Sequence, residues 1–205
     1  NGVGSLRVAR RDGTTIAHIA AAAGSLKVLR FIAEHPELGP DFIDTPTDGG
    51  DSVAHQAAQR GDVAVLQWLD ETLGTDALRA RRGERGVSIA QLAAEKKNNL
   101  PVLQFLADHP KLGPKFIAEP ARNGDTVALQ AAQRGDVDML RWLSDVCGPP
   151  LLLAQRDGHV TTALLAAGAG SLATLKYLAA HPDIGPRFFH VATDRGNTPA
   201  LLAAS

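Results

Sequence analysis

The sequence predicts an all-α solenoid, in which tandem helix pairs stack side by side, and two repeated patterns predict it. Residues 50–69 closely match residues 124–143 at an offset of 74 positions. A second pattern, His-Pro-x-Leu/Ile-Gly-Pro, occurs at 35–40, 109–114 and 181–186. Together these patterns define a unit of about 37 residues that alternates between two types. A unit of this size must bury its apolar face against its neighbours, which is what makes a stack.

Each unit begins with a segment that carries the start and stop signals of a short helix. A hydroxyl side chain precedes an apolar, alanine-rich run and can accept the unpaired N–H groups of a helix start. These residues are Thr15, Ser52, Ser88, Thr126, Thr161 and Thr198. The run ends at a glycine or asparagine, which tolerates the left-handed conformation that closes a helix. These stops are Gly24, Gly61, Asn98, Gly135 and Gly170. Paired alanines, from Ala20-Ala21 to Ala203-Ala204, should let neighbouring helices approach closely.

A second helix is predicted directly after each stop. Its preceding residue is a good N-cap in every copy. These caps are Ser25, Asp62, Asn99, Asp136 and Ser171. Apolar residues then recur at spacings of three and four, which is typical of one buried helix face. In the first copy the predicted stripe is Leu26, Leu29, Phe31 and Ile32. Trp68 takes the place of Phe31 in the second copy, and Leu172 begins the stripe of the fifth.

The helix pairs are joined by tight turns and, in alternate copies, by a longer link. Glycine-containing pairs, Asp-Gly and Asn-Gly above all, favour hairpin turns. They occur at Asp12-Gly13, Asp48-Gly49-Gly50, Arg85-Gly86, Asn123-Gly124, Asp157-Gly158 and Arg195-Gly196. In the odd copies a proline ends the second helix. We expect the apolar pair that follows, such as Phe42-Ile43 or Phe116-Ile117, to fold back onto the helical layer as one extra turn.

The order helix, turn, helix, hairpin resembles the ankyrin repeat. Residues 12–24, Asp-Gly-Thr-Thr-Ile-Ala-His-Ile-Ala-Ala-Ala-Ala-Gly, are similar to the family pattern Asp-Gly-x-Thr-Pro-Leu-His-x-Ala-Ala-x-x-Gly. The histidine of that pattern is kept only as His18 and His55, and the third copy has an extra residue near Lys97. The predicted organisation is one ankyrin-repeat domain over residues 1–205, expected to be a fragment of a longer array or protein. Its parts are the end of a preceding repeat at 1–11, full repeats at 12–47, 48–82, 83–121, 122–156 and 157–193, and a partial repeat at 194–205.

Composition narrows the classes of partner. The formal net charge is −1, from 21 basic and 22 acidic residues, so the chain lacks the field that drives phosphate-backbone binding. No apolar run approaches the roughly 18–20 residues that a membrane span needs. Cys147 is the single cysteine, which favours a reducing compartment. We therefore expect a cytoplasmic, monomeric chain that binds neither nucleic acid nor membrane.

Neither a catalytic site nor a metal or cofactor site is predicted. Three histidines recur at the C-terminal end of a second helix, where an imidazole favours the negative pole of the helix dipole. They are His35, His109 and His181, and positions one repeat apart lie too far from one another to share a metal ion. The resemblance implies that His18 and His55 form hydrogen bonds that order the turn. Cys147 has no recognisable catalytic base beside it and is interpreted as a plain thiol.

The resemblance implies binding to another protein and no enzyme activity in this chain. In ankyrin proteins, partners usually contact the hairpin tips and the exposed side of the first helix. The corresponding positions after the paired alanines are Gln59, Arg60, Glu95, Lys96, Gln133 and Arg134, with Ala22-Ala23 and Gly168-Ala169 in the other copies. The tips supply forked donors that suit carboxylates. These are Arg10, Arg11, Arg82, Arg85, Arg122 and Arg156. Alternatively, the tip arginines only solvate the loops.

A second function remains open from the sequence. The array could be the substrate-targeting arm of a larger enzyme, or of a secreted bacterial effector that acts in the host cytoplasm. The catalytic domain would then lie outside residues 1–205.

Overall fold

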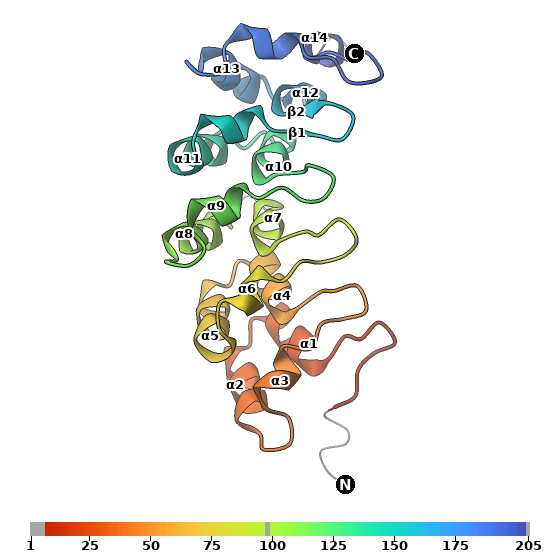
Figure 1. Ribbon diagram of the computed structural model, residues 1–205, viewed down its shortest axis with the longest axis vertical. Helices are drawn as coiled ribbons and strands as arrows, with labels where there is room; N and C mark the ends of the chain where they lie inside the picture. The colour runs from red at the N-terminus through yellow and green to blue at the C-terminus, as the bar shows by residue number, and fades with distance from the viewer. Residues whose placement is uncertain (1–6, 97–98, 204–205) are drawn as a thin grey trace. The chain divides into compact units, whose positions relative to one another are not determined.

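A computed structural model of the chain describes residues 7–96 and 99–203. The chain divides into two compact units, Asn1–Phe105 (unit 1) and Leu106–Ser205 (unit 2). Both units are built mainly of short helices joined by hairpins (Figure 1). The predicted all-α repeat architecture is confirmed. The predicted domain and repeat boundaries stay a prediction.

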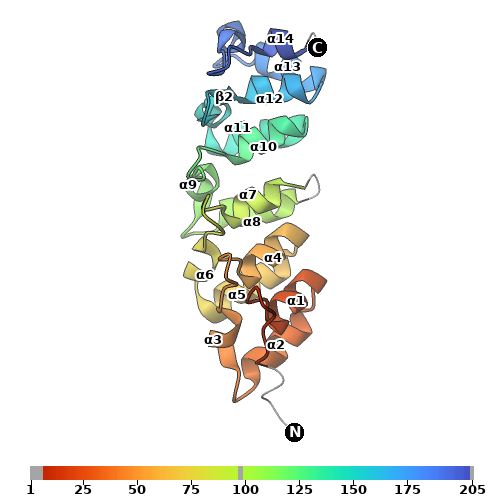
Figure 2. The ribbon, with the colours of Figure 1, turned by 90° about the vertical axis from the view of Figure 1, so that its right-hand side faces the viewer.

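The first helix of each repeat begins at the predicted hydroxyl residue. Helix α4 (Val53–Arg60) follows Ser52, whose Oγ accepts the backbone N–H of His55 at 3.4 Å. Equivalent bonds to Ser88, Thr126 and Thr161 start the later copies. The other first helices are α1 (Ile16–Ala23), α7 (Ile89–Ala94), α10 (Val127–Gln133), α12 (Thr162–Gly168) and α14 (Pro199–Ala203). In unit 1, α1, α4 and α7 lie side by side, and in unit 2 α10, α12 and α14 do the same (Figure 2).

Glycine and alanine shape these helices in different ways. Helices α1 and α4 end at Gly24 and Gly61, with φ of 71° and 89°, the left-handed region that glycine enters without a steric penalty. Ala57 and Ala58 are completely buried, so α4 contacts its neighbours almost backbone to backbone. The predicted stop at Asn98, the insertion near Lys97 and the last alanine, Ala204, lie outside the described residues.

The second helices form the outer layer of each unit. They are α2 (Leu26–Glu34), α5 (Val63–Leu73), α8 (Leu100–Asp108), α11 (Val137–Cys147) and α13 (Leu172–Ala180). The predicted caps form at Asp62, Asp136 and Ser171, which accept the N–H groups of Val65 at 3.2 Å, Met139 at 3.1 Å and Thr174 at 3.4 Å. Ser25 precedes α2 without a side-chain cap hydrogen bond, and the Asn99 amide donates to the carbonyls of Ala58 and Gln59. Where the cap satisfies a donor at the helix start, the second helix can begin directly after the stop of the first.

Short extra turns follow the second helices. In the odd repeats they are α3 (Gly39–Ile43), α9 (Gly113–Ala118) and the 3-10 helix η3 (Pro186–His190). Ile43 is 1% exposed and Phe116 2%, so the prediction that these apolar pairs fold back onto the helices is confirmed. The even repeats carry turns that the sequence analysis did not predict, α6 (Asp76–Arg79) and the 3-10 helix η2 (Pro149–Leu153).

Hairpins project from one side of the helical layers and are joined to one another. In unit 1 the N–H of Asp48 donates to the carbonyl of Asp12 at 3.0 Å, and that of Gly83 to Gly49 at 2.8 Å. In unit 2, the hairpins on either side are linked in the same way to the hairpin formed by β1 (Gln155–Arg156) and β2 (Val160–Thr161), which pair antiparallel. One backbone hydrogen bond per junction therefore fixes the spacing of successive hairpins within a unit.

Two residues of the predicted apolar stripe are exposed to solvent. Phe31 is 57% exposed and Leu172 61% exposed, whereas Leu29 and Ile32 are completely buried. Because a helix turns roughly 100° per residue, Phe31 lies roughly 160° from Leu29 around α2. Phe31 instead packs edge-on against the His35 ring, with centroids 5.7 Å apart. The prediction was wrong for Phe31 and Leu172. Trp68 has the same spacing in α5 and is 8% exposed, so the spacing alone does not decide which of these side chains is covered.

Candidate functional site

Unit 1 has a polar cleft at the C-terminal ends of its first helices. The cleft has a volume of about 460 Å³ and is lined by Ala22, Gln56, Gln59, Arg60 and Lys96. These residues come from three successive repeats, because Ala22 lies on α1, the next three lie on α4, and Lys96 follows α7. Four of the positions predicted from the sequence are thus brought together in one place. Glu95, the neighbour of Lys96, is exposed but does not line the cleft.

Unit 2 has a cleft of about 490 Å³ in the corresponding part of its fold, with a different lining. Gln133 and Arg156 contribute polar groups, and Val160, Leu164 and Leu165 contribute apolar ones. Gly168 and Ala169, which follow the paired alanines of the fifth copy, also line it. The same helix positions therefore line both clefts, although their chemistry differs.

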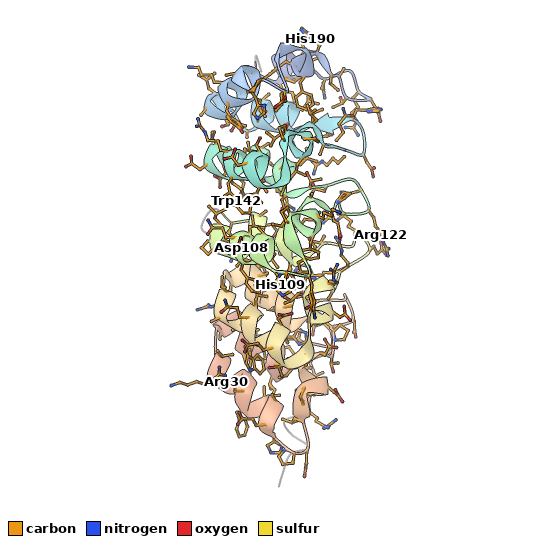
Figure 3. The ribbon with its side chains drawn as sticks, turned by 60° about the vertical axis from the view of Figure 1, so that its left-hand side comes forward. Arg30, Asp108, His109, Arg122, Trp142 and His190 are labelled. Atoms are coloured by element: carbon orange, nitrogen blue, oxygen red, sulfur yellow. The ribbon has the colours of Figure 1, made fainter. Side chains whose placement is uncertain are left out.

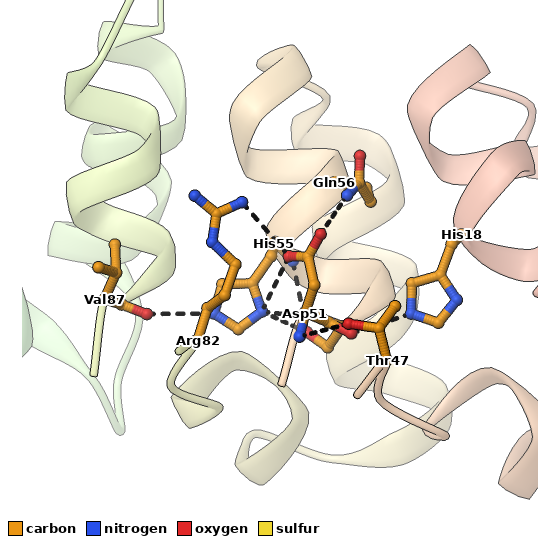
Figure 4. A network of polar contacts seen from close by, with 8 residues as sticks. His18, Thr47, Asp51, His55, Gln56, Arg82 and Val87 are labelled. Atoms are coloured by element: carbon orange, nitrogen blue, oxygen red, sulfur yellow. Dashed lines mark hydrogen bonds and ion pairs between the residues drawn. The ribbon is translucent and has the colours of Figure 1, made fainter. Parts of the chain in front are cut away.

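Two of the predicted tip arginines form ion pairs within the protein. Arg82 Nη1 lies 3.6 Å from Asp51 Oδ1 in unit 1, and Arg156 Nη1 lies 3.6 Å from Asp125 Oδ1 in unit 2. The Gln56 amide donates to the other oxygen of Asp51. Figure 4 shows this network, with His55 beside the carboxylate and the Thr47 hydroxyl accepting the backbone N–H of Asp51. Arg82 and Arg156 are thus less available to a partner than the sequence suggested.

Sequence reasoning missed this network, although the sequence contained a signal for it. Aspartate, glutamine and arginine recur together at the offset of 74 residues, as Asp51, Gln56 and Arg82 and then as Asp125, Gln130 and Arg156. The second set is arranged in the same way, because the Gln130 amide donates to Asp125 at 3.5 Å. Three side chains that repeat together over a fixed interval indicate a shared contact.

Arg134 also has an internal partner. Its Nη2 lies 3.4 Å from Asp136 Oδ2, and its side chain is 23% exposed. Arg60, at the same position of the second repeat, is instead exposed and donates from Nη1 to the Ala22 carbonyl of the first repeat at 3.2 Å. The two arginines occupy equivalent sequence positions, but the guanidinium that lines a cleft is that of Arg60.

The remaining predicted arginines lie on exposed hairpin segments. Arg10, Arg11, Arg85 and Arg122 are all exposed, and Figure 3 shows Arg122 at the edge of the molecule. None of the four lines either cleft. Acidic residues share the same tips, since Asp12 and Glu84 are exposed beside them. The tips therefore present charge of both signs.

The motif histidines join successive repeats. The N–H of Ser52 donates to His55 Nδ1 at 3.0 Å, so the ring proton is on Nε2, which donates to the Val87 carbonyl at 3.3 Å. His18 makes the equivalent contacts one repeat earlier, to the N–H of Thr15 and to a carbonyl of the next hairpin. The implied turn-ordering role is confirmed. Each histidine also holds the next hairpin in place.

Acid is expected to weaken unit 1 through His55. Burial lowers the pKa of this histidine below its ordinary value of 6.5, and the nearby Asp51 carboxylate opposes that effect. At a pH between the two pKa values, His55 binds a proton in the unfolded chain and stays neutral in the folded chain. The stability that the neutral His55 contributes is therefore fully present above pH 6.5 and is lost as the pH falls toward the folded pKa. We expect His55→Gln to reduce the loss of unfolding free energy between neutral pH and pH 5, measured by urea titration.

Glutamine is the matched replacement because the chain already uses it at this position. Gln91 Oε1 accepts the N–H of Ser88 at 2.9 Å, as His55 Nδ1 accepts that of Ser52. The variant keeps the cap and removes the titrating ring, while all other groups titrate equally in both proteins. An unchanged pH dependence would show that His55 does not control acid stability.

The three histidines after the second helices act as hydrogen-bond acceptors. The backbone N–H two residues further on donates to Nδ1 of His35 at 3.2 Å, of His109 at 3.2 Å and of His181 at 3.3 Å. An Nδ1 that accepts a hydrogen bond carries no proton. The repeated histidine therefore closes the turn through its lone pair, a role that the helix-dipole argument did not anticipate.

One cluster in unit 2 has the composition of a hydrolytic triad. Ser144 Oγ lies 3.0 Å from His181 Nε2, and Asp183 Oδ2 lies 4.0 Å from His181 Nδ1. Nδ1 accepts the backbone N–H of Asp183, so the ring proton is on Nε2 and points toward the serine. A general base needs its Nε2 lone pair toward that hydroxyl. In this arrangement His181 cannot take the proton of Ser144.

The Cys147 thiol is held in its protonated form. Burial raises its pKa to about 11, and its Sγ lies 3.7 Å from the carbonyl oxygen of Pro114, to which it donates a weak hydrogen bond. The thiolate is the reactive form of cysteine, so this pKa makes Cys147 a poor nucleophile at neutral pH.

Within the described residues, no group of three or more His, Cys, Asp or Glu side chains is arranged to hold a metal ion. None of the described helices combines the length and apolar character needed to cross a bilayer.

A search of curated proteins found no match. The family model described as ankyrin repeats (many copies) matches residues 17–69 and 91–143, more than half of the chain. The chain therefore belongs to the ankyrin-repeat family.

Proposed function

We propose that the chain binds another protein through the exposed C-terminal ends of its first helices, with the hairpin tips as a second contact. Ankyrin repeats are generally protein–protein interaction modules, and ankyrin-repeat domains are typically not catalytic.

One observation supports this surface above the others. Each of the five complete repeats contributes at least one of the two positions after its paired alanines to the lining of a cleft. In repeat order these two positions hold Ala-Ala, Gln-Arg, Glu-Lys, Gln-Arg and Gly-Ala, so they vary except between the two even repeats, whereas the alanines and caps around them stay nearly constant. Constant residues build the helix and its packing, so variable residues that line an open cleft are free to set specificity.

Site-specific photo-crosslinking tests the proposal. A photoreactive phenylalanine analogue replaces Gln59 or Gln133, which face the clefts, or Gln67 or Gln104, which are exposed on α5 and α8. We expect crosslinks to a partner protein in cell extract from the first pair and none from the second. All four replacements remove the same side chain, so the comparison depends on location alone. Equal crosslinking from Gln67 and Gln104 would contradict the proposal.

A further inference from the structure

The cleft of unit 1 concentrates positive charge. Among the described residues that line it, Arg60 and Lys96 are charged and none is acidic. Within the described part of the chain, neither cation has a carboxylate partner within ion-pair distance. This differs from Arg82, whose guanidinium is paired with Asp51.

The guanidinium of Arg60 is held in position and still has donors to spare. Its Nη1 donates to the Ala22 carbonyl, at the C-terminal end of α1. A methyl group at Gly24 would collide with this guanidinium, so the missing side chain there makes room for it. This hydrogen bond uses one of the five N–H donors of a guanidinium, and the Arg60 side chain that makes it also lines the cleft.

Neutral donors and space complete the arrangement. The Gln59 side chain, which directly precedes Arg60 in the sequence, also lines the cleft, and Ala22 contributes only a methyl group to the wall on the first repeat. The volume of about 460 Å³ falls within the range of about 300–1,000 Å³ that is typical of ligand sites. A forked guanidinium, an ammonium and an amide are donors that bind carboxylates.

Unit 2 lacks this arrangement although it repeats much of the sequence. At the position of Arg60, Arg134 pairs with Asp136. At the position of Lys96, the fifth repeat has Ala169. Its cleft is instead lined by apolar residues such as Leu164 and Leu165. The cationic cleft is therefore a property of unit 1 and not of every pair of repeats.

We infer that the cleft of unit 1 docks a carboxylate-rich segment of the partner protein, an extension that rests on the proposed function. The segment crosses from the second repeat to the third, with one acidic side chain on the Arg60 fork and another on the Lys96 ammonium. Hydrogen bonds from a charged donor to a carboxylate are stronger than those between neutral groups, so both contacts favour an acidic segment over a neutral one.

A peptide titration followed by NMR tests this inference on the whole chain. The probe is a short capped peptide of alternating glutamate and serine, and its matched partner has glutamine in place of glutamate. We expect the acidic peptide to shift the Arg60 Nε–H signal and the amide signals around Lys96, and the glutamine peptide to leave them in place. Arg60→Gln or Lys96→Gln should each weaken the affinity roughly fivefold, and both together about 25-fold if they act independently.

Arg30→Gln is the matched control, since Arg30 is exposed on α2 and points away from the helices into solvent (Figure 3). It should change the affinity less than about twofold, because Arg30 does not line the cleft and salt screens an exposed charge. Equal weakening by Arg30→Gln, or equal binding of the glutamine peptide, would overturn the inference. So would the same shifts with inorganic phosphate at equal ionic strength, because the cleft would then collect any anion.

Thermal unfolding of each variant separates docking from a capping role. Cations favour helix C-termini, so Arg60→Gln is expected to lower the melting temperature slightly. A lower melting temperature with unchanged peptide affinity would assign Arg60 to capping and overturn the inference. If the acidic peptide fails to bind while Gln59 still crosslinks to a partner, the acid preference is wrong and the proposed function stands. If the peptide binds but crosslinks come from α5 and α8, the proposed function is wrong.

Discussion

Replacing Trp68 with alanine is expected to remove about 3–5 kcal/mol from the unfolding free energy. Trp68 lies on α5 and is 8% exposed, so truncation leaves a large void and loses buried apolar area. Urea unfolding followed by far-UV circular dichroism measures the loss. Trp142 then remains as a fluorescent reporter inside unit 2.

The matched control for Trp68 is Phe31→Ala. Phe31 holds the same position one repeat earlier but is 57% exposed, so its truncation should cost less than about 1 kcal/mol. Similar losses for the two variants would mean that the difference in burial between α2 and α5 does not exist in solution.

The second large effect is expected from enlarging a buried alanine. Ala58 on α4 is completely buried between neighbouring first helices, so a leucine there must push the helices apart. We expect Ala58→Leu to cost about 1–3 kcal/mol or more, measured as a fall in the urea midpoint at unchanged slope. Ala64→Leu on the exposed side of α5 adds the same atoms and should change stability by less than about 0.5 kcal/mol. A tolerated leucine at position 58 would show that the alanine pair does not set the helix spacing.

Local features of the fold could be predicted from the sequence because their causes are local. A helix start depends on a hydroxyl or carboxylate three residues from the N–H that it accepts, as at Ser52 and Asp62. A helix stop depends on the backbone freedom of one residue, as at Gly24. The alternation of repeats was visible because the His-Pro pattern marks every second copy.

Contacts between repeats were harder to predict. The burial of Trp68 and the exposure of Phe31 follow from what packs against two helices with the same apolar spacing. Arg60 and Arg134 have nearly the same neighbours in sequence, yet one faces a cleft and the other turns to Asp136. A long side chain has many conformations, and its choice depends on atoms that lie far away in the chain. Residue type and spacing therefore identified the surface, while the structure was needed to show which cations on it are already neutralised.

The ion pair between Asp51 and Arg82, and its copy between Asp125 and Arg156, has a consequence for how such a chain can change in length. Each pair joins the first hairpin of an even repeat to the last residue of that same repeat, and the two pairs lie 74 residues apart. Cutting an even repeat between these residues would leave an aspartate without its arginine, whereas removing the whole repeat removes both partners together. Changes in length should therefore be tolerated best where whole repeats, and not parts of them, are gained or lost.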